Sequence, residues 1–164
     1  MTAFAPSPEI QRAIDSVLQK YPTKMAACIP VLHLCQDAVG WCSPEVIDWV
    51  AQRLELPTAH VQGVVTFYTL FHQKPVGKHV IWVCQTLPCA LRGAEGVLEH
   101  LESKLKIKVG ETSSDNLFTL KTAECLASCD SAPMFQIDKE YFENITNERI
   151  DDILGQFRAK ENPS

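Results

Sequence analysis

The sequence predicts a mixed α+β (α/β) protein: a helical bundle over residues 1–74, followed by an α/β unit over residues 75–164. Apolar residues recur at helical spacing through the first part of the chain. The period then changes at a short β-branched and aromatic run, 79–84 (HVIWVC). Beyond that run, strand-like and helix-like segments alternate, which is typical of a sheet covered by helices.

Four helices are expected in the first unit. The first three are expected to start at Pro8, about Lys24 and Pro44, and Thr58 is expected to cap the fourth. The third start is the clearest, because Ser43 can cap the helix, Pro44 suits its first position and Glu45 lies at the positive end of the helix dipole. Breaks are expected at Tyr21-Pro22, Gly40, Leu56-Pro57 and after Val65. The aromatic residues of this unit are predicted to form its core, with 67–71 as an alternative subunit contact.

The second unit is expected to contain three strands and two helices. The strands are predicted at 79–84, 117–122 and 134–138, and the first helix at 92–105. The last helix is expected to begin near Thr146 or Asn147. It would bury an apolar stripe formed by Ile150, Ile153, Leu154 and Phe157.

The composition is that of an ordinary globular protein, with 46% hydrophobic and 21% charged residues among 164. The net charge of -5 and the lack of a basic cluster argue against a nucleic-acid binder. The N-terminus does not resemble a signal peptide, and no apolar stretch approaches the roughly 20 residues that span a bilayer. We therefore expect a cytoplasmic chain, whose seven cysteines suit metal or redox chemistry better than disulfides.

Four of these cysteines form two spaced pairs in the second unit. Cys84 and Cys89 are a C-x₄-C pair, and Cys125 and Cys129 are a C-x₃-C pair. Each pair follows a predicted strand, so that the sulfurs can project from one end of the sheet. Four thiolates suit iron–sulfur clusters or zinc. Two separated pairs match a [2Fe–2S] cluster, which needs two thiolates on each iron.

Three other interpretations compete with a cluster. A structural Cys₄ zinc site, which would make the chain a zinc-stapled interaction module, is compatible with the spacing. A thioredoxin-type dithiol enzyme would require C-x-x-C, which neither pair has. Four buried, unliganded cysteines would make their pairing a coincidence. The cluster is the leading interpretation of these residues.

The remaining cysteines and glycines are predicted to be structural. Cys28, Cys35 and Cys42 lie seven residues apart, as on a helix stripe, and free cysteine is often buried. Gly93 and Gly96 have near-Rossmann spacing but are expected inside a helix. No phosphate-binding loop is present in the sequence, so we expect no catalysis by the isolated chain and assign no catalytic residues.

Segments on both sides of the unit boundary carry a family resemblance. Together with the cysteine spacing, 63–68 (GVVTFY) and 75–81 (PVGKHVI) resemble the 24-kDa subunit family of respiratory complex I, which in bacteria is the E subunit of NADH:quinone oxidoreductase. The resemblance extends from the helix near Pro8 to the one near Phe157. It implies a thioredoxin-like [2Fe–2S] ferredoxin fold in the second unit and the family's helical bundle in the first.

The resemblance also implies a role and a partner. Cys84, Cys89, Cys125 and Cys129 should ligate one [2Fe–2S] cluster, equivalent to cluster N1a, that exchanges single electrons with flavin and stores them temporarily. The partner should be the flavoprotein subunit that binds FMN, NADH and a [4Fe–4S] cluster, clasped by the helical bundle. The chain would lie at the inner face of the membrane through its complex. NAD-linked hydrogenases and formate dehydrogenases have equivalent subunits and are the alternative hosts.

Two positions near the cysteines differ from the family pattern. Relatives commonly have histidine where this chain has Ala90, and Leu-Gly where it has Leu126-Ala127. Neither difference removes a ligand. Both are expected to affect hydrogen bonding or backbone geometry around the cluster.

Overall fold

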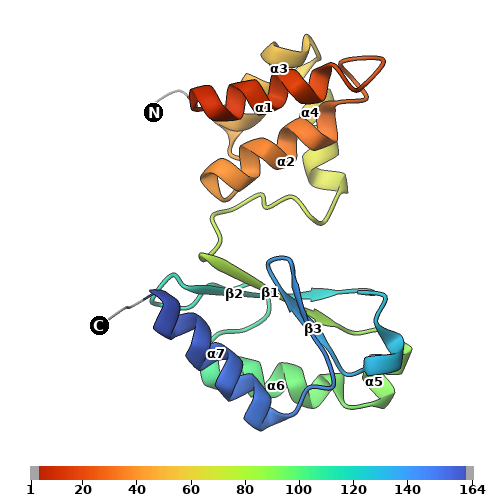
Figure 1. Ribbon diagram of the computed structural model, residues 1–164, viewed down its shortest axis with the longest axis vertical. Coiled ribbons are helices and arrows are strands. Elements are labelled where there is room, and N and C mark those ends of the chain that lie inside the picture. Colours follow the sequence, from red (N-terminus) through yellow and green to blue (C-terminus); the bar gives the residue numbers. More distant parts are fainter. Residues whose placement is uncertain (1–3, 162–164) are drawn as a thin grey trace. The chain divides into compact units, whose positions relative to one another are not determined.

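The computed structural model describes residues 4–161 (Figure 1). The chain divides into two compact units between Pro75 and Val76, next to the expected boundary at residue 74. No helix in the described part of the chain is both long and apolar enough to cross a membrane. Each unit has its own hydrophobic core.

The first unit consists of four helices. They are α1 (Pro8–Leu18), α2 (Cys28–Val39), α3 (Pro44–Leu54) and α4 (Thr58–Phe67). Ser43 caps α3 as predicted, its hydroxyl accepting a hydrogen bond from Val46 N at 3.2 Å. Gly40 ends α2 in the left-handed conformation, also as predicted. Cys28, Cys35 and Cys42 are at most 2% exposed in the core of this unit, which confirms that they are packed inside it.

Two details of the helical unit differ from the prediction. α2 begins at Cys28, about a turn later than expected, because 24–27 form turns instead. Thr58 does not cap α4: it is the first helical residue, and Pro57 occupies the cap position without a side-chain hydrogen bond. Both differences concern helix ends, which the apolar period does not define.

The second unit is built on a four-stranded mixed sheet. Its strands are β1 (His79–Cys84), β2 (Phe118–Ala123), β3 (Phe135–Ile137) and β4 (Glu140–Phe142). Their order across the sheet is β2-β1-β3-β4. β1 and β2 are parallel, whereas β3 is antiparallel to both β1 and β4. Thus the two parallel strands are direct neighbours.

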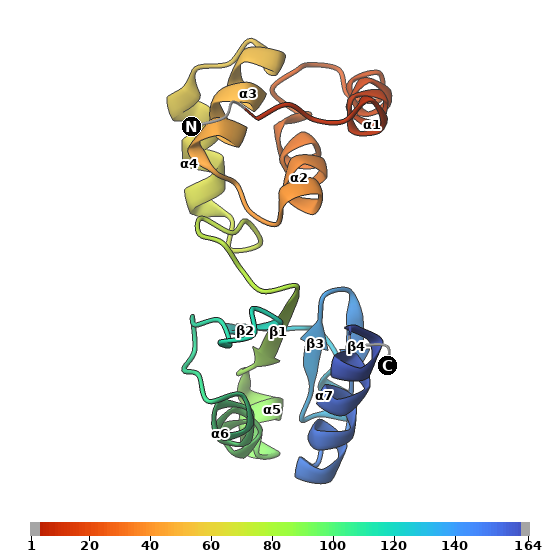
Figure 2. The same cartoon turned by 90° about the vertical axis from the view of Figure 1, so that its left-hand side faces the viewer.

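The helices of this unit are α5 (Leu87–Leu91), α6 (Ala94–Leu105) and α7 (Asn147–Glu161). Figures 1 and 2 show α6 and α7 side by side on one face of the sheet. Alternate strand residues, such as Ile81, Phe118 and Phe135, point into the core that these helices cover and are fully buried. The opposite alternation places Cys84 outside this core, in a smaller cluster.

Sequence patterns missed two short elements of this unit. They are β4, of three residues, and α5, of five residues, which carries Cys89. Gly93 is not inside a helix as expected. It precedes α6 with a positive φ of 95°, whereas Gly96 lies within α6.

Candidate metal centre

The parallel pairing of β1 and β2 brings both cysteine pairs to the same end of the sheet. Cys84 is the last residue of β1 and pairs with Ala123, the last residue of β2. Cys125 follows Ala123 by two residues. Cys89 lies in α5, directly after β1, and Cys129 begins a 3₁₀ turn (Cys129–Ser131) beyond β2. The two adjacent strands therefore place both cysteine pairs at the same end of the sheet.

The first pair is buried in an apolar cluster. Cys84 is 2% and Cys89 is 1% exposed, and both pack with Ala94, Ala132 and Met134. The Cys84 backbone N–H donates to the carbonyl of Met134 at 3.3 Å, which fixes the residue against the start of β3. Its sulfur lies 3.3 Å from the Thr86 hydroxyl oxygen. The first two sulfurs are therefore held on a rigid, dry platform.

The second pair is exposed. Cys125 and Cys129 both lie at the surface, on the loop that connects β2 to β3. The Ala127 backbone N–H donates to the sulfur of Cys125 at 3.3 Å. Arg92 Nη1 donates to the carbonyl of Asp130 at 3.4 Å, linking this loop to the segment after α5. One end of the sheet thus has an inner pair and an outer pair of thiols.

The pKa shifts of Cys84, Cys89 and Cys129 show which neighbouring groups act on these thiols. Burial, then the hydrogen bond and charge of Cys84, raise the pKa of Cys89 to about 11. Burial opposes ionisation of Cys84, but hydrogen bonds from Thr86, Leu126 and Cys89 leave its pKa below the ordinary value. Desolvation, followed by the charge of Cys125 and a hydrogen bond with it, raises the pKa of Cys129. After burial, the largest effect on the pKa of Cys89 therefore comes from Cys84, and the largest effect on the pKa of Cys129 comes from Cys125.

This donor set fits a two-iron group. Two pairs of soft thiolate donors, each pair internally in contact, provide two ligands for each of two metal ions. Ionising all four thiols without cations would place several negative charges in one small volume, as the mutual pKa effects indicate. Within residues 4–161, no three His, Cys, Asp or Glu side chains gather closely enough to surround a single metal ion.

Ala127 adopts a backbone conformation that favours glycine. Its φ is +60°, and its side chain is exposed. An L-residue in the left-handed region costs about 1–2 kcal/mol, and glycine, although it loses more entropy on folding, avoids this cost. We expect Ala127→Gly to raise the free energy of unfolding by about 0.5–1 kcal/mol, measured by urea denaturation of the metal-free chain. A lower free energy of unfolding would contradict this conformation.

In each unit, some residues lie where the sequence did not indicate. The prediction of aromatic core at 67–71 is wrong for Phe67 and Tyr68, which are 77% and 42% exposed, while Phe71 is buried. The hydrogen bonds of Glu143 to Ser128 and Ser131 were not predicted either. The spacing of these polar residues does not indicate that they are in contact, because they belong to two loops that are separated in the sequence.

Comparison with known proteins gives matches over most of the chain. The sequence model of the thioredoxin-like [2Fe–2S] ferredoxin family matches residues 14–158. The second E subunit of NADH-quinone oxidoreductase from Rhizobium meliloti (strain 1021) is 38% identical over 93% of this chain and 90% of its own length. The E subunit of NADH-quinone oxidoreductase from Rickettsia bellii (strain RML369-C) is 40% identical over 88% of each chain.

A solved structure shares the fold. An NAD⁺-reducing [NiFe]-hydrogenase in the air-oxidized state superposes with a TM-score of 0.71 over 81% of this chain, at 20% identity. The chain spans only 23% of that hydrogenase chain. This likeness extends to the fold alone. The sequence matches, by contrast, span both units and all four cysteines of the site, and by them the chain belongs to the thioredoxin-like [2Fe–2S] ferredoxin family, among the E subunits of NADH-quinone oxidoreductases.

Proposed function

We propose that this chain is the electron-transfer subunit of an NADH:quinone oxidoreductase and holds one [2Fe–2S] cluster on Cys84, Cys89, Cys125 and Cys129. The observation that carries the proposal is the arrangement of these thiols as two contacting pairs at one end of two parallel strands. When bound, such a cluster accepts and returns one electron at a time.

The two pairs have different tasks in this proposal. Cys84 and Cys89 hold the inner side of the site, where the surrounding apolar cluster excludes water. Cys125 and Cys129 hold the outer side at the protein surface, where a redox partner can approach. Backbone donors such as Ala127 N–H direct hydrogen bonds at the sulfurs, and hydrogen bonding to sulfur influences the reduction potential of a cluster.

The proposed partner is the flavoprotein subunit that binds FMN, NADH and a [4Fe–4S] cluster. The helical unit exposes Phe67, Tyr68 and Leu70, which are 77%, 42% and 60% exposed. Large apolar side chains grouped in this way favour a protein contact. These residues support the helical unit as the part that clasps the flavoprotein, and the complex would hold the chain at the cytoplasmic face of the membrane.

Spectroscopy of the purified chain tests the cluster. After anaerobic reconstitution with iron and sulfide, we expect a reddish protein whose visible bands bleach with dithionite. A colourless chain that binds stoichiometric zinc in its place would contradict the proposal. Affinity purification from the native host tests the complex: an NADH-oxidising flavoprotein and quinone-reducing subunits are expected, whereas a hydrogenase or formate dehydrogenase large subunit would identify the alternative host.

A further inference from the structure

The loop that carries the exposed cysteine pair needs a support of its own. Cys84 and Cys89 are held by a strand, a helix and an apolar cluster, whereas Cys125 and Cys129 are exposed and belong to a connecting loop. A ligand pair on a mobile loop would bind metal weakly, because the loop would have to be ordered on binding. The residues that order this loop are therefore functionally important.

Glu143 provides the support through two serines that flank Cys129. One carboxylate oxygen, Oε1, accepts hydrogen bonds from the Ser128 hydroxyl and, at 2.8 Å, from the Ser131 hydroxyl. The two hydroxyl oxygens are themselves 2.9 Å apart. In addition, the Asn144 backbone N–H donates to the Ser131 carbonyl at 2.8 Å. Three polar side chains thus converge around one residue of the outer pair.

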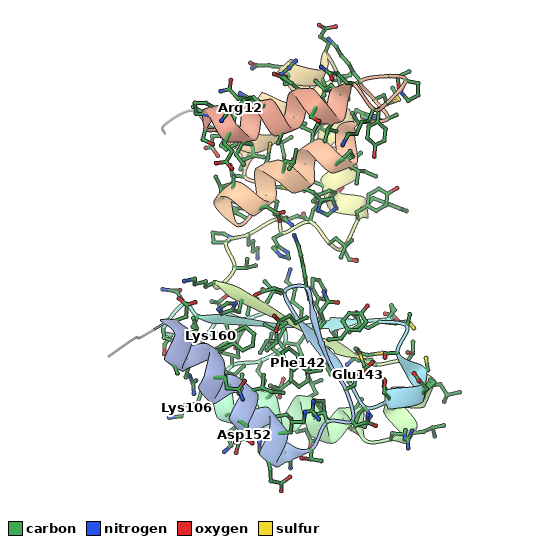
Figure 3. The ribbon with its side chains drawn as sticks, in the orientation of Figure 1. Arg12, Lys106, Phe142, Glu143, Asp152 and Lys160 are labelled. Atoms are coloured by element: carbon green, nitrogen blue, oxygen red, sulfur yellow. The ribbon has the colours of Figure 1, made fainter. Side chains whose placement is uncertain are left out.

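Glu143 is itself well anchored. It directly follows β4, and its neighbour Phe142 stacks on Phe135 with ring centroids 5.5 Å apart and contacts Phe157 of α7 at 6.2 Å. Figure 3 labels Phe142 and Glu143, with Glu143 on the side of the unit that carries α5. The carboxylate therefore connects the cysteine loop to the sheet and its core, and this connection limits the motion of the loop.

The carboxylate of Glu143 also carries charge at neutral pH. Hydrogen bonds from Ser128 and then Ser131 lower its pKa, and Arg149 adds a smaller effect in the same direction. A negative charge beside a redox centre disfavours the reduced state, which is one electron more negative.

We infer that Glu143 is a positioning residue for the cluster: it holds the Cys129 loop through Ser128 and Ser131, and its charge lowers the reduction potential. This inference rests on the proposed ligand set. Two variants separate the effect of the hydrogen bonds from the effect of the charge. Glu143→Gln removes the charge but keeps an oxygen that accepts hydrogen bonds. Glu143→Ala removes both the charge and the hydrogen bonds.

The first test uses the metal-free full-length chain. Hydrogen exchange followed by mass spectrometry should show faster exchange of the amides at 128–131 in Glu143→Ala, and near wild-type exchange in Glu143→Gln. Glu140→Gln is the matched control. Glu140 begins β4, the strand that Glu143 follows, and pairs with Ile137. The Phe142 end of β4 pairs with Phe135, the residue nearer Cys84.

The second test uses the reconstituted chain and a redox titration followed by the signal of the reduced cluster. Glu143→Gln should favour the reduced form about three- to tenfold, and tenfold corresponds to about 59 mV for a one-electron couple. Glu140→Gln should shift the potential less. Equal potentials in all three proteins, or unchanged exchange in Glu143→Ala, would overturn the positioning role. A wild-type chain that takes up no cluster would instead overturn the proposed function, and it would be recognised before any variant is compared.

Discussion

Replacing Cys125 with alanine should abolish or cripple the visible absorption of the reconstituted chain while leaving the protein folded. Cys125 is one of the two ligands proposed for the outer side of the site, and the three cysteines outside the proposed ligand set are buried in the core of the helical unit. Because its side chain is exposed, its removal leaves no core cavity, and the free energy of unfolding of the metal-free chain should change by less than about 0.5 kcal/mol. Iron analysis and the visible spectrum measure the first effect, and urea denaturation measures the second.

Cys28→Ala is the matched control for this experiment. Cys28 is 2% exposed in the core of the helical unit, whereas the candidate centre belongs to the second unit. Its replacement should lower the free energy of unfolding by about 1 kcal/mol and retain the complete spectrum. A full spectrum in the Cys125 variant, or loss of the spectrum in the Cys28 variant, would show that the ligand assignment is wrong.

The parts of the fold that the sequence predicted are those defined by local chemistry. Ser43-Pro44 specifies a helix start through its own side chain and ring, and the structure has the predicted cap. The run 79–84 matches β1 residue for residue, because its β-branched and aromatic residues have no helical period. By contrast, α5 and β4 are too short to show any period, so their residues resemble loop.

The exposure of Phe67 follows from the helical period of α4. Val61 and Val65 are buried one turn apart on α4. Phe67 lies two residues beyond Val65, about 200° around the helix, and therefore on the opposite face. The helix period itself places this residue outside the bundle core. An aromatic side chain by itself therefore does not indicate burial on this helix.

The sequence indicates the ligands that we propose for the candidate site, but it does not indicate their surroundings. Spacing alone indicates two thiol pairs, and strand patterns indicate that each pair follows a strand. That β1 and β2 are parallel neighbours, which brings the pairs together, is a property of the sheet order. The contrast between the buried first pair and the exposed second pair, and the contact of Glu143 with Ser128, also depend on long-range packing.

Gly77→Ala should destabilise the second unit by about 1–3 kcal/mol, because the new methyl group has no space. A Cβ atom at Gly77 would lie 2.9 Å from both the backbone N and the backbone C of Phe118 and 3.0 Å from the backbone C of Leu117. These are main-chain atoms at the start of β2, and they cannot rotate away as a side chain can. The Gly77 N–H also donates to Thr119 Oγ1 at 2.6 Å, so the segment cannot move away without losing this bond.

Gly96→Ala separates this steric effect from the ordinary cost of replacing glycine. Gly96 is exposed within α6, and a Cβ atom there would meet nothing within 4 Å. That variant should be more stable than the wild type by about 0.5–1 kcal/mol, since alanine favours a helix. Hydrogen exchange of β1 and β2 amides in increasing urea measures both changes within the second unit itself. If Gly77→Ala changed the stability of the second unit in the same way as Gly96→Ala, the inferred steric conflict between residue 77 and β2 would be wrong. If it is destabilised as expected, β1 and β2 depend on this contact at the end opposite the cysteines, and the same variant should also weaken retention of the cluster.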